Sequence, residues 1–214
     1  MTRLMGDAIH DNVPALAQAP GLQVAAGYVT GSPDILWTAA DWARFSMPHV
    51  TIDQGYTGSP VPSADVRDVE AGAWTPAAAV NLSGWTAAQP TIYCSLSVLP
   101  QVAQAGWQGA VWVADWTGTP PASPPAVPAG MTCVAVQYTD QGGGGAYDLS
   151  VVFDPAWPAK GDPVPTVLTQ PDWSFCNKCF GLFYNDGQLA AGVCPAGGQH
   201  TVNPSLPYVM LYAQ

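Results

Sequence analysis

Short apolar segments recur at close intervals through the first three quarters of the chain, and this repetition constrains the fold more than any other feature of the sequence. Most of them are apolar on both faces, which is typical of strands in a parallel sheet that is covered on both sides. We expect about eight such strands before residue 155. The segments are Met5–Ile9, Leu22–Val29, Val50–Asp53, Ala64–Gly72, Thr91–Ser95, Gly109–Asp115, Cys133–Tyr138 and Asp148–Phe153.

Helix signals lie between these segments. Thr38 and the Thr75-Pro76 pair are residues that often begin helices, and Ser97–Ala105 reads as a further helix. The strand–helix rhythm predicts an α/β fold, a small and somewhat irregular (β/α) barrel of the TIM type. A complete barrel of this type usually needs ~200 residues or more. Several helices should therefore be short or missing, most clearly across the proline-rich stretch Thr119–Pro128.

Charge excludes two classes of partner. The chain has five Lys and Arg residues in total, a formal net charge of −10, and only 9% charged residues. A basic surface for nucleic acid is therefore not expected, and anionic membranes are poor partners for the same reason. No run approaches the ~18 apolar residues of a membrane span, so we expect no membrane insertion. The first residues also lack the apolar region of a signal peptide.

Composition changes after Phe153, where prolines become frequent. A proline-rich stretch of this kind is typical of a semi-rigid linker. We therefore expect a barrel over residues 1–157, a linker over 158–171 and a small C-terminal module over 172–214.

The stretch ADVRDVEAG, residues 64–72, contains the most suggestive pair of acids. Glu70 is the only glutamate among fifteen acidic residues. On a strand, Asp68 and Glu70 share one face with Cα atoms ~6.5–7 Å apart. Two carboxyl groups at that spacing can take acid and base roles if their environments differ. The alternative is a solvated edge strand whose carboxylates have no function.

Polar side chains stand at the carboxyl ends of the expected strands, where a barrel forms its active site. Trp112 and Trp116 flank Asp115, and aromatic rings beside carboxylates suit a sugar. Alternatively, these residues simply mark where solvent begins. The strand-end residues are Asp7, Asp53, Asp68, Glu70, Tyr93, Asp115, Gln137, Tyr138 and Asp148.

Five motifs in this order resemble the family-25 muramidases and, more closely, the glycoside-hydrolase-like domain of actinobacterial and phage proteins. They are DVE, IYC, VWVADW, VAVQY and YDLSVV, and the resemblance covers Gly6–Trp157. It implies a small barrel acting on cell-wall glycans, with Glu70 as general acid and Asp68 as its partner. Asp7 and Asp148 match the acids of the first and last strands. Tyr93 and Gln137 would line the groove. From their places at and beside the strand ends, Trp112, Asp115, Trp116 and Tyr138 are further candidates for substrate binding.

Cysteines crowd into the C-terminal module. Cys176 and Cys179 form a C-x-x-C knuckle, and Cys194 and His200 follow as C-x5-H. Three thiolates and an imidazole predict a closed tetrahedral zinc site that stabilises a module too small to fold on its core alone. The alternative is a disulfide from Cys176 to Cys179 or Cys194. The segment also resembles a small module attached to bacterial and phage proteins.

Two functions remain open. The first is a glycan hydrolase of the muramidase type, and the second is a non-catalytic protein that keeps only the barrel fold and serves a structural or cell-surface-binding role. The resemblance to phage-borne domains and the missing signal peptide favour a virion, most plausibly its tail. The expected partners are cell-wall glycan and other virion proteins.

Overall fold

The computed structural model describes residues 1–55, 61–70, 74–158, 168–180, 182–184 and 193–212. The chain divides into two compact units, Met1–Lys160 and Gly161–Gln214. Most of the expected linker, residues 159–167, lies outside the described residues. In the part of the chain that is described, no helix is long and apolar enough to cross a membrane.

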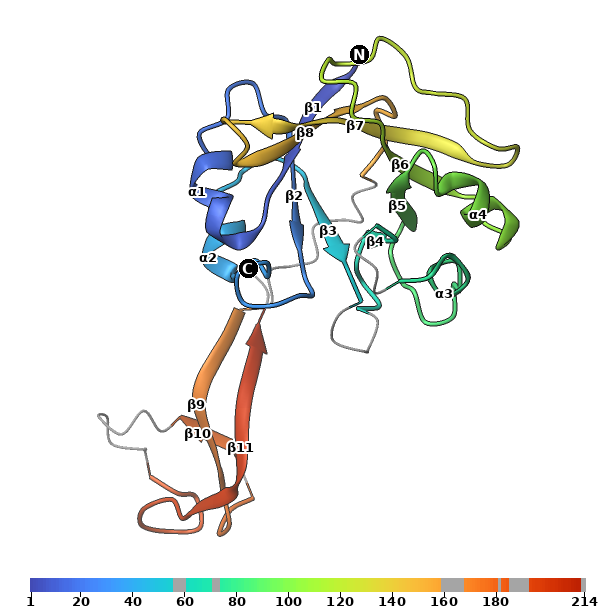
Figure 1. Ribbon diagram of the computed structural model, residues 1–214. Coiled ribbons are helices and arrows are strands. Elements are labelled where there is room, and N and C mark those ends of the chain that lie inside the picture. The colour runs from blue at the N-terminus through green and yellow to red at the C-terminus, as the bar shows by residue number, and fades with distance from the viewer. Residues whose placement is uncertain (56–60, 71–73, 159–167, 181, 185–192, 213–214) are drawn as a thin grey trace. The chain divides into compact units, whose positions relative to one another are not determined.

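The first unit is a closed barrel in which the strands follow one another in sequence order (Figure 1). Strands β1 to β7 run parallel, whereas β8 is antiparallel to both β7 and β1. The strands are β1 (Arg3–Asp7), β2 (Val24–Tyr28), β3 (His49–Asp53), β4 (Val66–Asp68), β5 (Thr91–Ser95), β6 (Ala110–Ala114), β7 (Thr132–Gly142) and β8 (Tyr147–Val152). Each lies within or overlaps one of the segments expected from the sequence.

The last strand departs from the expected (β/α) barrel of the TIM type, in which all strands are parallel. The chain turns tightly through residues 143–146 between β7 and β8. A connection this short joins antiparallel strands, because a parallel crossover needs a dozen or more residues. Gly143, Gly144 and Gly145 have positive φ angles, a backbone conformation that glycine adopts without strain.

Helices on the outside of the barrel are short. They are the 3-10 helix η1 (His10–Asn12) and the α-helices α1 (Val13–Leu16), α2 (Ala39–Trp42), α3 (Pro76–Ala79) and α4 (Leu99–Gln104). Thr38 caps α2 in a capping box with Asp41, and Thr75 caps α3. The described residues 115–131, between β6 and β7, contain no helix, as the proline-rich sequence predicts.

Apolar side chains fill the barrel. Met5, Val50, Val66 and Trp112 belong to one buried cluster inside the strands. Trp157 packs in the same cluster, and its indole N–H donates to Thr91 Oγ1 at 2.8 Å. The barrel is therefore packed rather than hollow, and ligands are confined to its ends.

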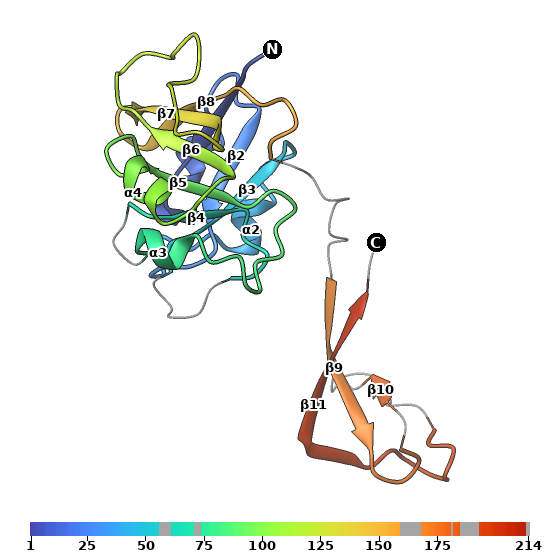
Figure 2. The same cartoon turned by 90° about the vertical axis from the view of Figure 1, so that its right-hand side faces the viewer.

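The second unit contains a three-stranded antiparallel sheet (Figure 2). Strand β9 (Leu168–Cys176) lies between β10 (Leu182–Tyr184) and β11 (Val202–Tyr212). The strands lead into two loops that carry the cysteine and histidine residues of the expected module.

Candidate functional site

Carboxyl side chains meet at the end of the barrel where the parallel strands finish. Asp7 is the last residue of β1, and Asp68 is the last residue of β4. Asp148 lies directly opposite Asp7 in the antiparallel pairing of β1 with β8. The reversed direction of β8 thus brings an acid from the start of that strand to the carboxyl ends of the others.

Gln137, on β7, joins side chains from four other parts of the barrel. Its Nε2 donates to Asp148 Oδ2 at 3.0 Å and to Asp7 Oδ1 at 3.4 Å. Its Oε1 accepts hydrogen bonds from Tyr93 Oη and from Trp116 Nε1, both at 2.7 Å. Gln137 is only 2% exposed, so its carboxamide is buried among these partners. We call these five residues with Asp68 and Glu70 the mouth cluster.

Asp68 and Glu70 are arranged differently from two residues on one strand face. Strand β4 ends at Asp68, whose Oδ1 accepts a hydrogen bond from the backbone N–H of Glu70 at 2.8 Å. An Asp side chain that bonds the backbone two residues on makes a turn, and this turn ends the strand. Asp68 is consequently buried, whereas Glu70 is exposed and accepts from Tyr93 Oη at 2.9 Å.

Burial and mutual repulsion raise the pKa values of the buried acids. The pKa of Asp7 is raised well above its ordinary value by burial and then by Asp148, although Gln137 lowers it. Burial, followed by Asp140 and Glu70, raises the pKa of Asp148 to about 6. The pKa of Tyr93 is also raised, first by burial and then by Glu70, so its phenol keeps its proton.

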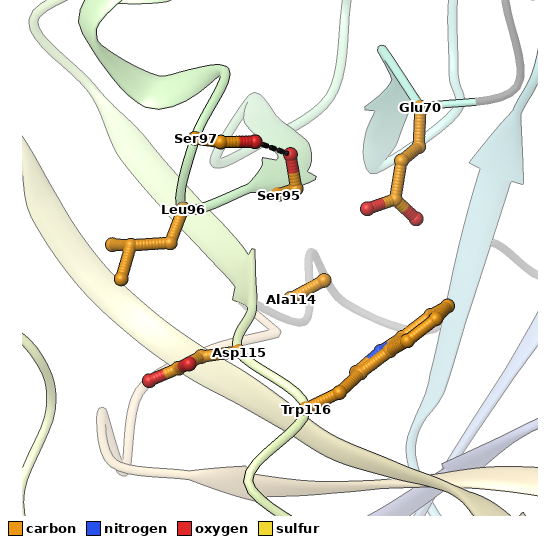
Figure 3. Close-up of a pocket in the computed structure, with 7 residues that line it drawn as sticks. All are labelled: Glu70, Ser95, Leu96, Ser97, Ala114, Asp115 and Trp116. Atoms are coloured by element: carbon orange, nitrogen blue, oxygen red, sulfur yellow. Dashed lines mark hydrogen bonds between the residues drawn. The ribbon is translucent and has the colours of Figure 1, made fainter.

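An open depression of about 300 Å³ lies beside the mouth cluster (Figure 3). Trp116 is 58% exposed, and its ring and the Glu70 carboxyl both line this depression. Its lining residues are Glu70, Ser95, Leu96, Ser97, Ala114, Asp115 and Trp116. A second hollow, of about 160 Å³, is lined by Asp7, Tyr28 and Asp148 among others. Polar groups and an aromatic face thus border space open to a ligand.

Three residues expected in the groove lie elsewhere or point away. Trp112 is 1% exposed and belongs to the barrel interior, where its indole N–H donates to Ser150 Oγ at 3.1 Å. Tyr138 is 6% exposed and follows Gln137 on β7, so alternation places it on the other face of the strand. Asp115 lines the depression, but its carboxyl points away from Glu70 (Figure 3).

Asp53, another strand-end acid, accepts hydrogen bonds from nearby backbone N–H groups rather than facing a ligand site. It is fully buried and accepts hydrogen bonds from Thr30 Oγ1 and from the backbone N–H groups of Gly55 and Val61. These bonds hold the chain after β3, so Asp53 is a structural residue.

Two residues near the cluster were missed by sequence reasoning. Tyr28 ends β2, and its pKa is raised well above the ordinary value by burial and then by Asp7. Gln54 follows β3, and its Nε2 donates to Asp68 Oδ2 at 3.4 Å. Both lie at the carboxyl ends of strands, where a barrel forms its active site. Applying this criterion to every expected strand would have included them.

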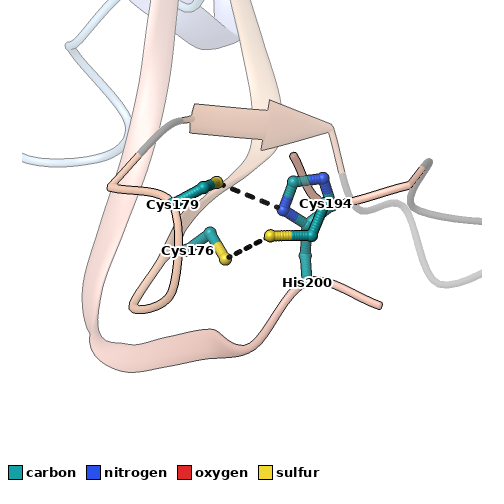
Figure 4. A group of neighbouring side chains, drawn as sticks. All are labelled: Cys176, Cys179, Cys194 and His200. Atoms are coloured by element: carbon teal, nitrogen blue, oxygen red, sulfur yellow. Dashed lines mark hydrogen bonds between the residues drawn. The ribbon is translucent and has the colours of Figure 1, made fainter. Parts of the chain in front are cut away.

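The second unit brings its four predicted metal ligands together (Figure 4). The ligand atoms of Cys176, Cys179, Cys194 and His200 all lie within 4.8 Å of one another. Cys176 Sγ is 3.8 Å from Cys194 Sγ, and Cys179 Sγ is 3.7 Å from His200 Nδ1. The structure has all three of these cysteines as free thiols, an arrangement that favours the metal site over the disulfide alternative.

These distances fit a tetrahedral ion. Two sulfur ligands at ~2.3 Å from zinc lie ~3.8 Å apart, and a sulfur and a nitrogen ligand lie slightly closer. Burial alone raises the pKa of the Cys176 thiol, but hydrogen bonds from the backbone N–H groups of Cys179 and Thr201 lower it to about 5. The thiolate is the form that binds metals. The Phe183 ring stacks on His200 at 4.3 Å between centroids and holds its imidazole in place.

Comparison with known proteins gives two distant likenesses among solved structures. No family model and no curated protein matches the chain. An uncharacterized B. stearothermophilus protein is 15% identical with a TM-score of 0.46, over 72% of this chain and 96% of its own. The Clostridium perfringens spore cortex lytic enzyme SleM is 13% identical with a TM-score of 0.45, over 89% of this chain and 77% of its own. Both likenesses are too low to carry an inference about this chain.

Proposed function

We propose that the barrel unit is glycoside-hydrolase-like and acts on a cell-wall glycan, with Glu70 as general acid and Asp68 as its partner. The observation that carries this proposal is the arrangement at the depression. Glu70 and the exposed Trp116 ring border the same open space, and the buried Asp68 carboxyl accepts a hydrogen bond from the Glu70 backbone N–H.

In the proposed reaction, Glu70 donates a proton and Asp68 then stabilises the charge that develops. Glu70 gives its proton to the glycosidic oxygen, which leaves with one sugar as its bond to the anomeric carbon breaks, and positive charge develops at that carbon of the sugar that remains. Asp68 stabilises that charge or holds an N-acetyl group that attacks as an internal nucleophile. Asp148, with a pKa of about 6, adds negative potential at the same end of the barrel near neutral pH.

The substrate class follows from two features. An aromatic face beside hydrogen-bonding groups suits a pyranose ring, which packs on the ring and bonds through its hydroxyls. Trp116 supplies such a face. The choice of a cell-wall glycan, and of a virion setting among other virion proteins, rests on the motif resemblance. We also propose that the fold is related to the (β/α) barrel of the TIM type and differs from it in the antiparallel direction of its last strand.

We also propose that the Cys/His cluster holds one Zn²⁺ in a structural role. Four protein ligands close a tetrahedral ion and leave no position for a substrate. Cys176, Cys179, Cys194 and His200 supply those four ligands. The ion would join the loop after β9 to the loop before β11.

Substitution of Glu70 by Gln tests the catalytic proposal. We expect Glu70→Gln to lower the release of reducing ends from purified cell wall by about 100-fold to 10,000-fold, the usual contribution of a general acid. The melting temperature should stay nearly unchanged, since Glu70 is exposed.

Asp154→Asn is the matched control. Asp154 belongs to the other end of the barrel, where its Oδ1 accepts from the backbone N–H of Ala156, and Asn keeps that acceptor. This control should cleave cell wall as the unaltered protein does. If the unaltered protein binds cell-wall glycan but releases no reducing ends, the barrel is a binding protein.

A further inference from the structure

The sheet of the second unit narrows from three strands to two along its length. Strand β10 pairs with β9 only at residues 173–175 of β9. Residues 168–170 of β9 pair with residues 210–212 of β11 alone, so these segments form a two-stranded ribbon (Figure 2). A two-stranded ribbon is marginally stable in water, whereas three or more strands can be stable. Among the residues that the structure describes, none adds a third strand to the ribbon, so its edges are open to an added strand.

The free edge of β9 along the ribbon is poorly suited to pairing. The register advances by three positions on β9, from 173 to 170, against two on β11, from 208 to 210, so β9 bulges here. Pro171 lies in this bulge, and proline has no backbone N–H to donate. Bulges and prolines both protect a sheet edge from pairing. An added strand is therefore not expected on β9.

The free edge of β11 is protected over its first part and open over its last. Pro204 and Pro207 lie in the first part, where the register with β9 also shifts. The last part, residues 208–212, reads YVMLY and contains no proline. No residue of β11 is charged, in a chain whose formal net charge is −10. Residues 208–212 are therefore an unprotected edge that two copies of the chain can share without bringing like charges together.

We propose that this edge pairs antiparallel with the same edge of a second copy, with Met210 at the two-fold axis. Met210 is the central residue of the open stretch, so this register uses the whole stretch in each copy. Each copy then supplies the strand that the other lacks, and the ribbon becomes four-stranded. Antiparallel pairing of identical edges is isologous and closes at a dimer. The dimer does not depend on the function proposed for the barrel.

The mass of the full chain in solution tests the proposal. By sedimentation velocity we expect a species of twice the 22.3 kDa chain, which dissociates on dilution. Met210→Lys sets two lysines opposite each other at the axis and should raise the dimer Kd by about tenfold. Ser205→Lys is the matched control, because it adds the same charge to the same strand between its two prolines. It should leave the Kd unchanged.

Crosslinking tests the register and does not depend on whether the lysine variant folds. Residues directly opposite in an antiparallel pair have Cα atoms ~4.5–5.5 Å apart, which a disulfide can span. Met210→Cys should therefore give a disulfide-linked dimer on mild oxidation. A mixture of Tyr208→Cys with Tyr212→Cys should also crosslink, whereas either variant alone should not. Ser205→Cys and the unaltered protein are the controls and should stay uncrosslinked.

A monomer at every concentration would overturn the proposal and leave the edge of β11 to a strand of another protein. An assembly larger than a dimer would also overturn it, because isologous pairing stops at two copies. So would a dimer that keeps its Kd in Met210→Lys and is not crosslinked in Met210→Cys, since its interface would then lie elsewhere.

Discussion

Two aspartates lie side by side at the mouth of the barrel, and their charges oppose folding. Asp7 and Asp148 are paired in register on β1 and β8, and Gln137 bonds both. Burial raises the pKa of each. A carboxyl with a higher pKa in the folded than in the unfolded chain binds its proton more tightly when folded. The free energy of unfolding therefore falls as the pH rises.

For Asp148 this fall begins near the ordinary pKa of 3.8 and is complete above the folded value of about 6. We expect Asp148→Asn, which keeps an acceptor for Gln137, to be more stable than the unaltered protein above pH 6. The gain should be on the order of 1–2 kcal/mol, since partial exposure screens the full shift.

Urea unfolding followed by tryptophan fluorescence across this pH range measures the effect. Below about pH 4 the two proteins should be equally stable, because the carboxyl is then protonated in both states. Asp11→Asn, at an exposed aspartate outside the mouth cluster, serves as control. An Asp148→Asn variant less stable than the unaltered protein at every pH would contradict this account.

Only some of the residues at the site could be predicted from the sequence. Asp7, Asp68 and Tyr93 were found from their places near strand ends, and the structure brings them together. Trp112 was misplaced because an aromatic residue beside an acid fits a binding groove and a core equally well. Its position inside the barrel depends on strand register, and one residue of register moves every side chain to the opposite face.

At the scale of elements, the strands were easier to predict than their ends. Near-continuous apolar segments gave β2, β5 and β6 close to their observed bounds, whereas β7 continues four residues beyond the expected end at Tyr138. The end of β4 depends on a bond from the Asp68 side chain to the Glu70 backbone, which composition does not reveal. The direction of β8 was signalled by the glycine-rich turn before it, a sign of a hairpin rather than a crossover.

Strand β2 offers a test of how an element is packed. The Trp37 ring lies flat against Gly27, and a Cβ atom there would overlap the ring. Trp37 is buried, and its indole N–H donates to the Ala8 oxygen at 2.7 Å, so the ring is not free to move aside. We expect Gly27→Ala to lower the free energy of unfolding by about 1–3 kcal/mol through overpacking.

Denaturant unfolding in a second background identifies the obstacle. Trp37→Leu removes the ring, so Gly27→Ala should cost clearly less when added to Trp37→Leu. An equal cost in both backgrounds would mean that the Trp37 ring is not what excludes the methyl group.

At the scale of the whole molecule, the two units depend on different sources of stability. The described residues of the barrel include three buried apolar clusters. Among the described residues of the second unit, the buried apolar cluster consists of Cys176, Phe183 and Cys194, two of which are ligands of the proposed ion. Metal binding and folding should therefore be coupled in this unit.

Removal of the ion should consequently unfold one unit and spare the other. We expect one zinc per chain by elemental analysis of protein purified without added metal. Cys179→Ser, or a strong chelator, should make residues 172–214 sensitive to protease while the barrel stays resistant. Cys133→Ser, at a buried cysteine of the barrel, should leave the zinc content unchanged. Properly folded protein with much less than one zinc would refute the metal proposal.

The pairing of β1 with β8 sets the order in which the molecule can become functional. Arg3 and Asp7 contact residues about 140 positions or more along the chain, through the register with β8 and a bond from Arg3 to the Trp157 oxygen. Contacts at such sequence separation close late, because loop entropy must be lost first. During synthesis, the first six strands can be complete while Asp7 still lacks Gln137 and Asp148. The part of the mouth cluster that contains Asp7, Gln137 and Asp148 therefore forms only when the ring of strands closes, after Asp68 and Tyr93 can already have met through the pairing of β4 with β5.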